Sequence, residues 1–151
     1  MANSSAMCTS FKSEAMTALH ALGTTVTRGA TTADTLKAAL YLVSGSLGAG
    51  TTAYSATSEV SGTNYTAGGN TVTNATAPSN SGTTGFWTPS AALVWAAVTL
   101  STAFDSVLFY NSTQSNRAIS VHNFGSTTIT AGTLTLNMPT NAAGTALLNI
   151  A

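Results

Sequence analysis

The sequence has very little charge. Charged residues make up 5% of its 151 positions, against roughly 25% in ordinary soluble domains. Lysine and arginine together number four and balance four acidic residues, so the formal net charge is zero. Without a basic stripe to attract phosphates, we expect no nucleic-acid partner. Copies of such a chain also repel one another weakly, which suits a protein that is held among neighbours in an assembly.

Cysteine and long apolar runs are scarce as well. Cys8 is the single cysteine, so the chain cannot form an internal disulfide. The longest apolar stretch, residues 91–100, is interrupted by Thr99 and is far shorter than the roughly 20 residues of a membrane span. The first residues lack the charged and apolar regions of a secretory signal. We therefore expect synthesis in a cytoplasm and no membrane partner.

What the sequence has in quantity is the alternation of apolar and polar residues that is typical of β-strands. The last third of the chain shows it best, with strand-like runs at residues 105–111, 117–123, 127–130 and 133–138. Turn residues separate these runs, including Phe124-Gly125-Ser126. Residues 35–43 also alternate, and although their Ala and Leu content permits a helix, we predict a strand.

The rest of the chain completes a mostly β architecture. Ser10 suits an N-cap and Gly23 a C-terminal stop, so we predict one amphipathic helix over residues 10–22. Residues 1–9 are expected to be flexible, and residues 78–85 to form a polar, flexible loop. Turn signals recur at the spacing of about 8–12 residues that is seen in sandwiches. We predict a single β-sandwich or jelly-roll-like domain over residues 10–151 with one short N-terminal helix.

Side chains that carry chemistry are few and scattered. His20 and His122 lie far apart in the sequence, and Cys8 has no neighbouring base. The acidic residues offer no adjacent pair for acid–base catalysis. We therefore predict that the chain is not an enzyme and has no catalytic, cofactor-binding or metal-binding residues.

Two carboxylates and one tyrosine stand out as structural residues. Glu59 and Asp105 each lie where a loop meets an ordered segment, and we expect them to cap an element or to form one salt bridge, for example with Arg117. Tyr65 lies among three glycines, which permit unusual backbone angles. We expect Tyr65 to anchor its loop to the core.

Three segments, taken in order, carry a resemblance. Residues 10–16 read SFKSEAM, residues 59–69 read EVSGTNYTAGG, and residues 105–136 form a strand–turn–strand ending. They resemble the opening helix, the "E-x-S-G-x-G-Y-x-x-G-G" loop and the ending of small structural proteins of tailed bacteriophages. Asn64 stands where the motif usually has glycine.

The resemblance implies a virion component, of the capsid decoration or cement type, without catalytic residues. We expect it to bind the major capsid protein on the outer capsid surface and to form a homo-oligomer, a dimer or trimer, since 44% of its residues are hydrophobic. The expected contact elements are the residues before Ser10 and the loops 44–69 and 78–85.

Two alternative functions remain open at this point. One is a structural role in the neck or tail of the virion instead of the capsid. The other is a carbohydrate-binding, adhesive β-sandwich. Its candidate stacking platforms are Tyr54, Tyr65, Trp87 and Trp95.

Overall fold

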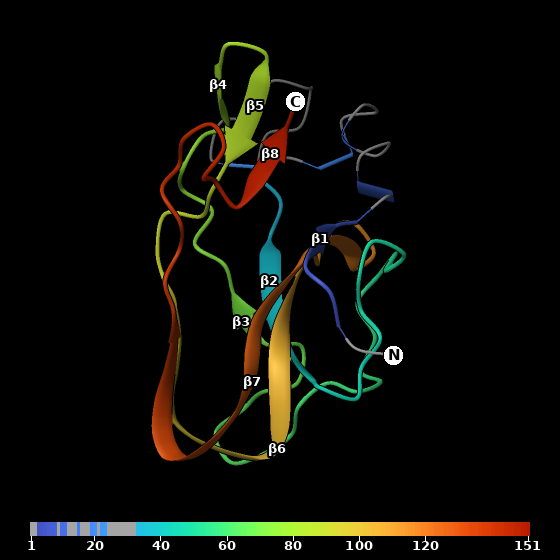
Figure 1. Cartoon of the computed structure of the whole chain (residues 1–151), viewed down its shortest axis with the longest axis vertical. Helices are drawn as coiled ribbons and strands as arrows, with labels where there is room; N and C mark the ends of the chain where they lie inside the picture. The colour runs from blue at the N-terminus through green and yellow to red at the C-terminus, as the bar shows by residue number, and fades with distance from the viewer. Residues whose placement is uncertain (1–2, 9, 12–14, 16–18, 21, 24–32) are drawn as a thin grey trace.

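The computed structural model describes residues 3–8, 10–11, 15, 19–20, 22–23 and 33–151. Within them the protein is mostly β, as predicted, and its strands form two antiparallel sheets (Figure 1). The predicted helix over residues 10–22 falls mainly outside the described residues. The strands are β1 (Ala6–Met7), β2 (Leu36–Leu42), β3 (Asn70–Thr71), β4 (Ser79–Ser81), β5 (Thr84–Trp87), β6 (Leu93–Asn111), β7 (Arg117–Leu136) and β8 (Leu148–Ile150).

The larger sheet has five strands in the order β1-β7-β6-β2-β3, and the smaller has three in the order β4-β5-β8. The core lies where β2 pairs with the second half of β6. Every residue from Phe104 to Asn111 is buried there, because the strand is covered on both faces. The prediction of a strand over residues 35–43 is confirmed by β2.

The last third of the chain differs from the prediction of several short strands. β6 and β7 instead form one long hairpin of 19 and 20 residues. The expected turn at Phe124-Gly125-Ser126 is wrong, since β7 continues through it. Gly125 has a φ of 88°, which bends the strand without ending it. The sequence pattern breaks at such points, but the backbone pairing between the two strands resumes beyond them.

Register shifts bend this hairpin into a U. Pairing runs from Leu93 with Leu136 to Asn111 with Arg117, and most of the shifts lie between Trp95 and Ser106. Figure 1 shows the bend at the bottom of the molecule. β-Bulges increase local twist and curvature. We call residues 104–111 with 117–127 the turn arm, and residues 93–100 with 129–136 the open arm.

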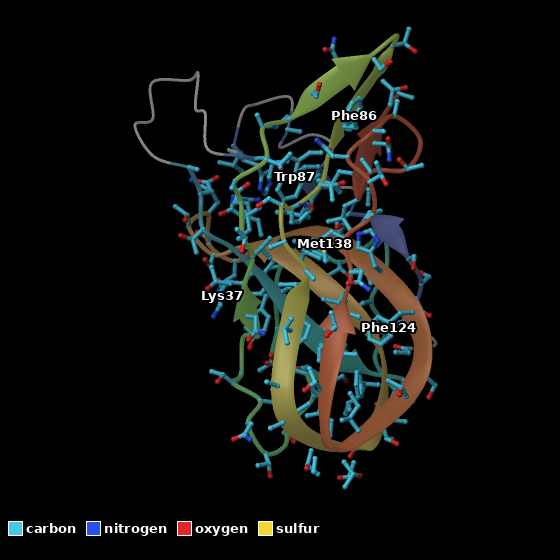
Figure 2. All side chains as sticks on the ribbon, turned by 90° about the vertical axis from the view of Figure 1, so that its left-hand side faces the viewer. Lys37, Phe86, Trp87, Phe124 and Met138 are labelled. Atoms are coloured by element: carbon cyan, nitrogen blue, oxygen red, sulfur yellow. The ribbon has the colours of Figure 1, made fainter. Side chains whose placement is uncertain are left out.

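The smaller sheet corrects the prediction of a flexible loop over residues 78–85. β4 and β5 form a hairpin there, in which Ser79 pairs with Phe86, and β8 pairs with β5. Gly82, with a φ of 56°, forms its turn. The hairpin projects at the end of the molecule opposite the bend of the U (Figures 1 and 2). Its side chains at 79–81 are exposed, so no apolar alternation marks the strand.

Candidate interaction surface

Glu59 is the centre of a cluster of hydrogen bonds in loop 44–69. Its carboxylate accepts hydrogen bonds from Tyr54 Oη at 2.6 Å, from Tyr65 Oη at 2.8 Å and from the Gly68 backbone N–H at 2.7 Å. Hydrogen bonds to an ionised acceptor are roughly twice as strong as neutral ones. Glu59 thus accepts hydrogen bonds from uncharged donors, in place of the capping or Arg117 salt bridge that we expected. These bonds connect three separate points of loop 44–69 through one carboxylate.

All four tyrosines of the chain gather around this carboxylate. The Tyr110 ring stacks on Tyr54 at 4.7 Å between centroids, and Tyr110 Oη donates to Gly68 O at 2.7 Å. Tyr41 Oη donates to Ser55 O at 2.6 Å. Tyr65 Oη accepts from the Leu40 N–H of β2 at 3.0 Å. The prediction that Tyr65 anchors its loop to the core is therefore confirmed. We call these four residues with Glu59 the tyrosine cluster.

The phenols of the tyrosine cluster remain protonated donors over the physiological pH range. Burial raises the pKa of Tyr41, Tyr54, Tyr65 and Tyr110 above the ordinary value of 10.0, and the negative charge of Glu59 raises it further. A phenolate beside Glu59 would place two negative charges together. The cluster is thus built to hold the loop in place.

Glycines allow the loop to approach β2 and β6 closely. A Cβ at Gly69, which has a φ of 67°, would lie 1.9 Å from Ala38 O of β2. A Cβ at Gly62 would lie 2.1 Å from Thr99 O of β6. Asn64 has a φ of 59°, a left-handed conformation that asparagine tolerates better than most residues. Its Nδ2 donates to Ala97 O at 2.9 Å, so the loop reaches the bend of the U.

The anchored loop presents small, uncharged side chains to solvent. Among its exposed residues are Thr52, Ala53, Ser55, Ala56, Thr57, Ser61, Thr63, Asn64, Thr66 and Ala67. Such a surface allows close approach and backbone hydrogen bonding by a partner, and it offers no charge for electrostatic docking.

The N-terminal segment joins the same surface. Asn3 Nδ2 donates to Leu42 O at 3.0 Å and to Asp105 Oδ1 at 2.6 Å, and Asn3 Oδ1 accepts from the Leu47 N–H at 3.0 Å. β1 then pairs with β7, and Cys8 is buried. Asp105 serves here as the acceptor that fixes Asn3. The mobility that we expect of residues 1–9 in solution stays a prediction.

The four candidate stacking platforms for carbohydrate all contact other parts of the protein, and two of them are buried. Trp87 and Trp95 are 2% and 3% exposed, and Trp87 Nε1 donates to Thr76 O at 2.9 Å. Tyr54 and Tyr65 belong to the tyrosine cluster. Both tryptophan rings are therefore buried, and one face of the Tyr54 ring is covered by Tyr110.

An apolar cavity of about 360 Å³ lies between the turn arm and the segment that follows β7. Its walls include Val107, Phe109 and Leu136. Phe124 and Met138, labelled in Figure 2, line it from β7 and from the segment after it. The cavity thus brings apolar side chains of the turn arm together with the end of β7 and the segment that follows it.

The two histidines lie in separate polar clusters of the described residues. His122 Nε2 lies 3.0 Å from Ser120 Oγ, and burial lowers the pKa of His122 below 6.5. His20 Nδ1 lies 3.1 Å from Asn111 Nδ2, which also donates to Asp34 at 2.7 Å. Among described residues, no three His, Cys, Asp or Glu side chains group as metal ligands.

Comparisons with known proteins leave the family open. No family model matches the chain, and neither curated sequences nor solved structures give a match. Among the helical residues that the structure describes, no segment has the length and apolar character to cross a membrane.

Proposed function

We propose that the chain is a virion structural protein of a tailed bacteriophage that binds the outside of the assembled capsid and stabilises it. The observation that carries the proposal is the anchoring of loop 44–69. A carboxylate and four tyrosines fix the conformation of a loop whose exposed side chains are small and uncharged. Pre-ordering lowers the entropic cost of binding, and small side chains permit close contact with a protein lattice.

The distribution of contact elements supports a bridging role. Loop 44–69 reaches the bend of the U, where Thr63 pairs with Thr99, whereas the β4–β5 hairpin projects at the opposite end (Figure 1). Two contact regions at opposite ends suit a protein that spans neighbouring capsid subunits. Linked contacts add avidity without any new chemistry. The finer architecture that we propose is a β-sandwich or jelly-roll-like fold, formed as the two arms of the U pack over the apolar cavity.

Stabilisation would follow from mass action. A protein that binds the assembled lattice but not free subunits adds RT ln(1 + [L]/Kd) per site, about 2.7 kcal/mol at a hundredfold excess over Kd. Because the contact surface carries so little charge, binding should depend weakly on salt. The major capsid protein is the proposed partner, and the proposal assigns no catalysis to the chain.

The test is to strip the protein from purified particles, measure their heat resistance, and add the protein back at low and at high salt. We expect stripped particles to break at a lower temperature and rebinding to persist in high salt. Equal robustness of stripped particles would overturn the stabilising role. Loss of rebinding in moderate salt would overturn the uncharged mode of contact.

Contact-site variants sharpen this test. Thr57→Lys in loop 44–69 and Ser81→Lys in the hairpin place a charge on exposed positions of the two contact regions. Ala143→Lys, also at an exposed position, is the control outside both regions. Bridging predicts that either contact variant weakens rebinding while the control does not. The copy number per particle then separates the capsid from the neck or tail, where only a few rings of copies fit.

A further inference from the structure

A short segment near the start of the chain connects two regions that are far apart in the sequence. At one end, the Ser4 N–H donates to Leu47 O at 3.0 Å, in the first part of loop 44–69. At the other end, β1 pairs with the part of β7 that belongs to the turn arm. We call residues 3–8 the N-terminal strap. Figure 1 shows its blue trace beside the teal loop that follows β2.

Asn3 fixes the strap at a point where three parts of the fold meet. Its side chain is 8% exposed. Nδ2 lies 3.0 Å from Leu42 O at the end of β2, 2.6 Å from Asp105 Oδ1 and 2.6 Å from Ser106 Oγ of β6. Oδ1 accepts from the Leu47 N–H at 3.0 Å. An amide combines donors with an acceptor, so this one side chain joins β2, β6 and the loop.

A buried carboxylate faces the amide of Asn3. Asp105 is 8% exposed, and its Oδ1 also accepts from the Ser106 hydroxyl at 2.8 Å. A buried charge is costly unless hydrogen bonds compensate it, and hydrogen bonds to charged acceptors are stronger than neutral ones. We therefore expect the bond from Asn3 to Asp105 to contribute most of the attachment at this end of the strap.

The loop is shaped to receive the strap. Gly45 and Gly48 have no positive φ, so their backbone conformation is open to other residues. A Cβ at Gly45 would lie 2.8 Å from Asn3 Oδ1, and a Cβ at Gly48 would lie 2.7 Å from Ser4 Oγ. Both distances are too short for a Cβ contact. The two glycines thus leave the space that the strap occupies.

The strap can open without unfolding the sheets. Ser4 and Ser5 are exposed, and β1 is only half-buried. Segments with few buried apolar contacts open at the lowest free energies. The tyrosine cluster holds the later part of the loop through contacts outside the strap. The first part, residues 44–48, is held by Asn3 instead.

We propose that Asn3 is a positioning residue for loop 44–69 and that the N-terminal strap controls whether this loop can bind. With Asn3 docked, the strap fixes the first part of the loop and the tyrosine cluster fixes the later part. With Asn3 released, residues 44–48 move, and the entropic cost of binding rises. This inference rests on the proposed function, because it takes the loop as the capsid contact. It deepens that function by naming what regulates the contact.

Asn3→Asp tests the positioning role, because it removes the donor and brings a second carboxylate to Asp105. Two carboxylates at this distance repel each other. In the free protein we expect amide hydrogen exchange at Leu47 to accelerate by about tenfold or more, the factor that follows from losing a hydrogen bond to a charged group. Exchange at the Gly68 N–H, a donor within the tyrosine cluster, should stay unchanged. Asn137→Asp, on an exposed asparagine after β7, adds the same charge and is the matched control.

Exchanging the two side chains separates positioning from general destabilisation. Asp105→Asn alone keeps an acceptor for Asn3 and should have a small effect. Combined with Asn3→Asp, it restores one amide and one carboxylate at the site, so the double variant should recover part of the protection at Leu47. From the loop side, Gly45→Ala should also accelerate exchange at Leu47, because its Cβ meets Asn3 Oδ1. Gly50→Ala, with nothing within 4 Å of its Cβ, should not.

Two results in the free protein would overturn the inference. One is unchanged exchange at Leu47 in Asn3→Asp. The other is equal acceleration at Leu47 and Gly68 without recovery in the double variant, because Asn3 would then stabilise the whole fold and not the loop.

The consequence for binding is measured on stripped particles. Asn3→Asp should rebind more weakly than the wild type, and Asn137→Asp should rebind normally. If Asn3→Asp rebinds normally although its Leu47 N–H exchanges rapidly, the strap does not control binding and the inference is wrong. Failure of the capsid role itself shows separately, in the heat resistance of the stripped particles.

Discussion

Replacing Glu59 with glutamine changes one oxygen of the tyrosine cluster and keeps the side-chain shape. The carboxylate accepts three hydrogen bonds, from Tyr54, Tyr65 and the Gly68 N–H. Glutamine has a single acceptor oxygen, and its amide N–H₂ group would face a phenol that is itself a donor. If that oxygen replaces Oε1, the hydrogen bond from Tyr54 is lost and the other two lose their ionic partner.

The expected cost follows from these contacts. A hydrogen bond to a charged group contributes about 1.5–3 kcal/mol, and a neutral one about 0.5–1.5 kcal/mol. The loss of one hydrogen bond and the weakening of two would together lower the stability by roughly 4 kcal/mol if water could not reach the site. Glu59 and Tyr54 are only half-buried, so water replaces part of the loss, and we expect about 2 to 3 kcal/mol.

Urea unfolding followed by far-ultraviolet circular dichroism measures this loss. With a slope of about 1–3 kcal/mol per molar, Glu59→Gln should lower the midpoint by roughly 1 M or more. Tyr54→Phe is the control that removes one donor only and should cost less. The double variant should cost less than the two single losses together, because both remove the same hydrogen bond. A Glu59→Gln midpoint within error of the wild type would refute this account of the cluster.

Two further predictions follow from the same contacts. The pKa values of the four phenols are raised in the native state, so their contribution to stability is complete below pH 10 and is lost as the pH rises above it. Absorbance near 295 nm should therefore show the phenols ionising together when the protein unfolds. An ordinary phenol titration near pH 10 in the folded protein would contradict this prediction. Gly62→Ala should destabilise the protein by about 1–3 kcal/mol in the same urea assay, because a Cβ there meets Thr99 O, whereas Gly50→Ala, with nothing within 4 Å, should be neutral.

Local pattern was enough to predict several parts of the fold. β2 was predicted because residues 35–43 alternate over a full strand length and end at Ser44-Gly45, which decided against the helix that their Ala and Leu content permits. Tyr65 was recognisable as an anchor because glycines surround it and few other large side chains occur nearby. In both cases the physical determinant lies within about ten residues of sequence, which a pattern can capture.

The continuity of β6 and β7 lies beyond such a pattern. Ala97 and Ala131 have φ values of 51° and 47°, yet alanine gives no sign that it will adopt a left-handed conformation. A bulge shifts the alternation from one face to the other, so one bent strand resembles two straight ones. The β4–β5 hairpin was missed for a related reason: its first strand, β4, is fully exposed and has no apolar face to alternate with.

The hydrogen-bond partners of Glu59 lie within its own loop, but the other two tyrosines of the cluster were hidden because they come from distant positions. Tyr110 lies on β6 and Tyr41 on β2, and the paired strands bring both to the loop that holds Glu59. The only signal in the sequence was that carboxylates are scarce. Because the chain has so few carboxylates, one that lies between a loop and the core indicates a specific hydrogen-bonding role.

The two contact regions of the proposed function act together through linked binding. In that proposal a single copy contacts the lattice through loop 44–69 and through the β4–β5 hairpin, whose exposed side chains are small and uncharged. Each contact alone would have a modest affinity, and linked binding events multiply affinity when their geometry allows them to act together. Thr57→Lys and Ser81→Lys should therefore each weaken capsid attachment by more than the loss of one weak contact. A chain that carries so little charge would in this way obtain firm binding from linked and pre-ordered contacts, where other proteins use ionic contacts.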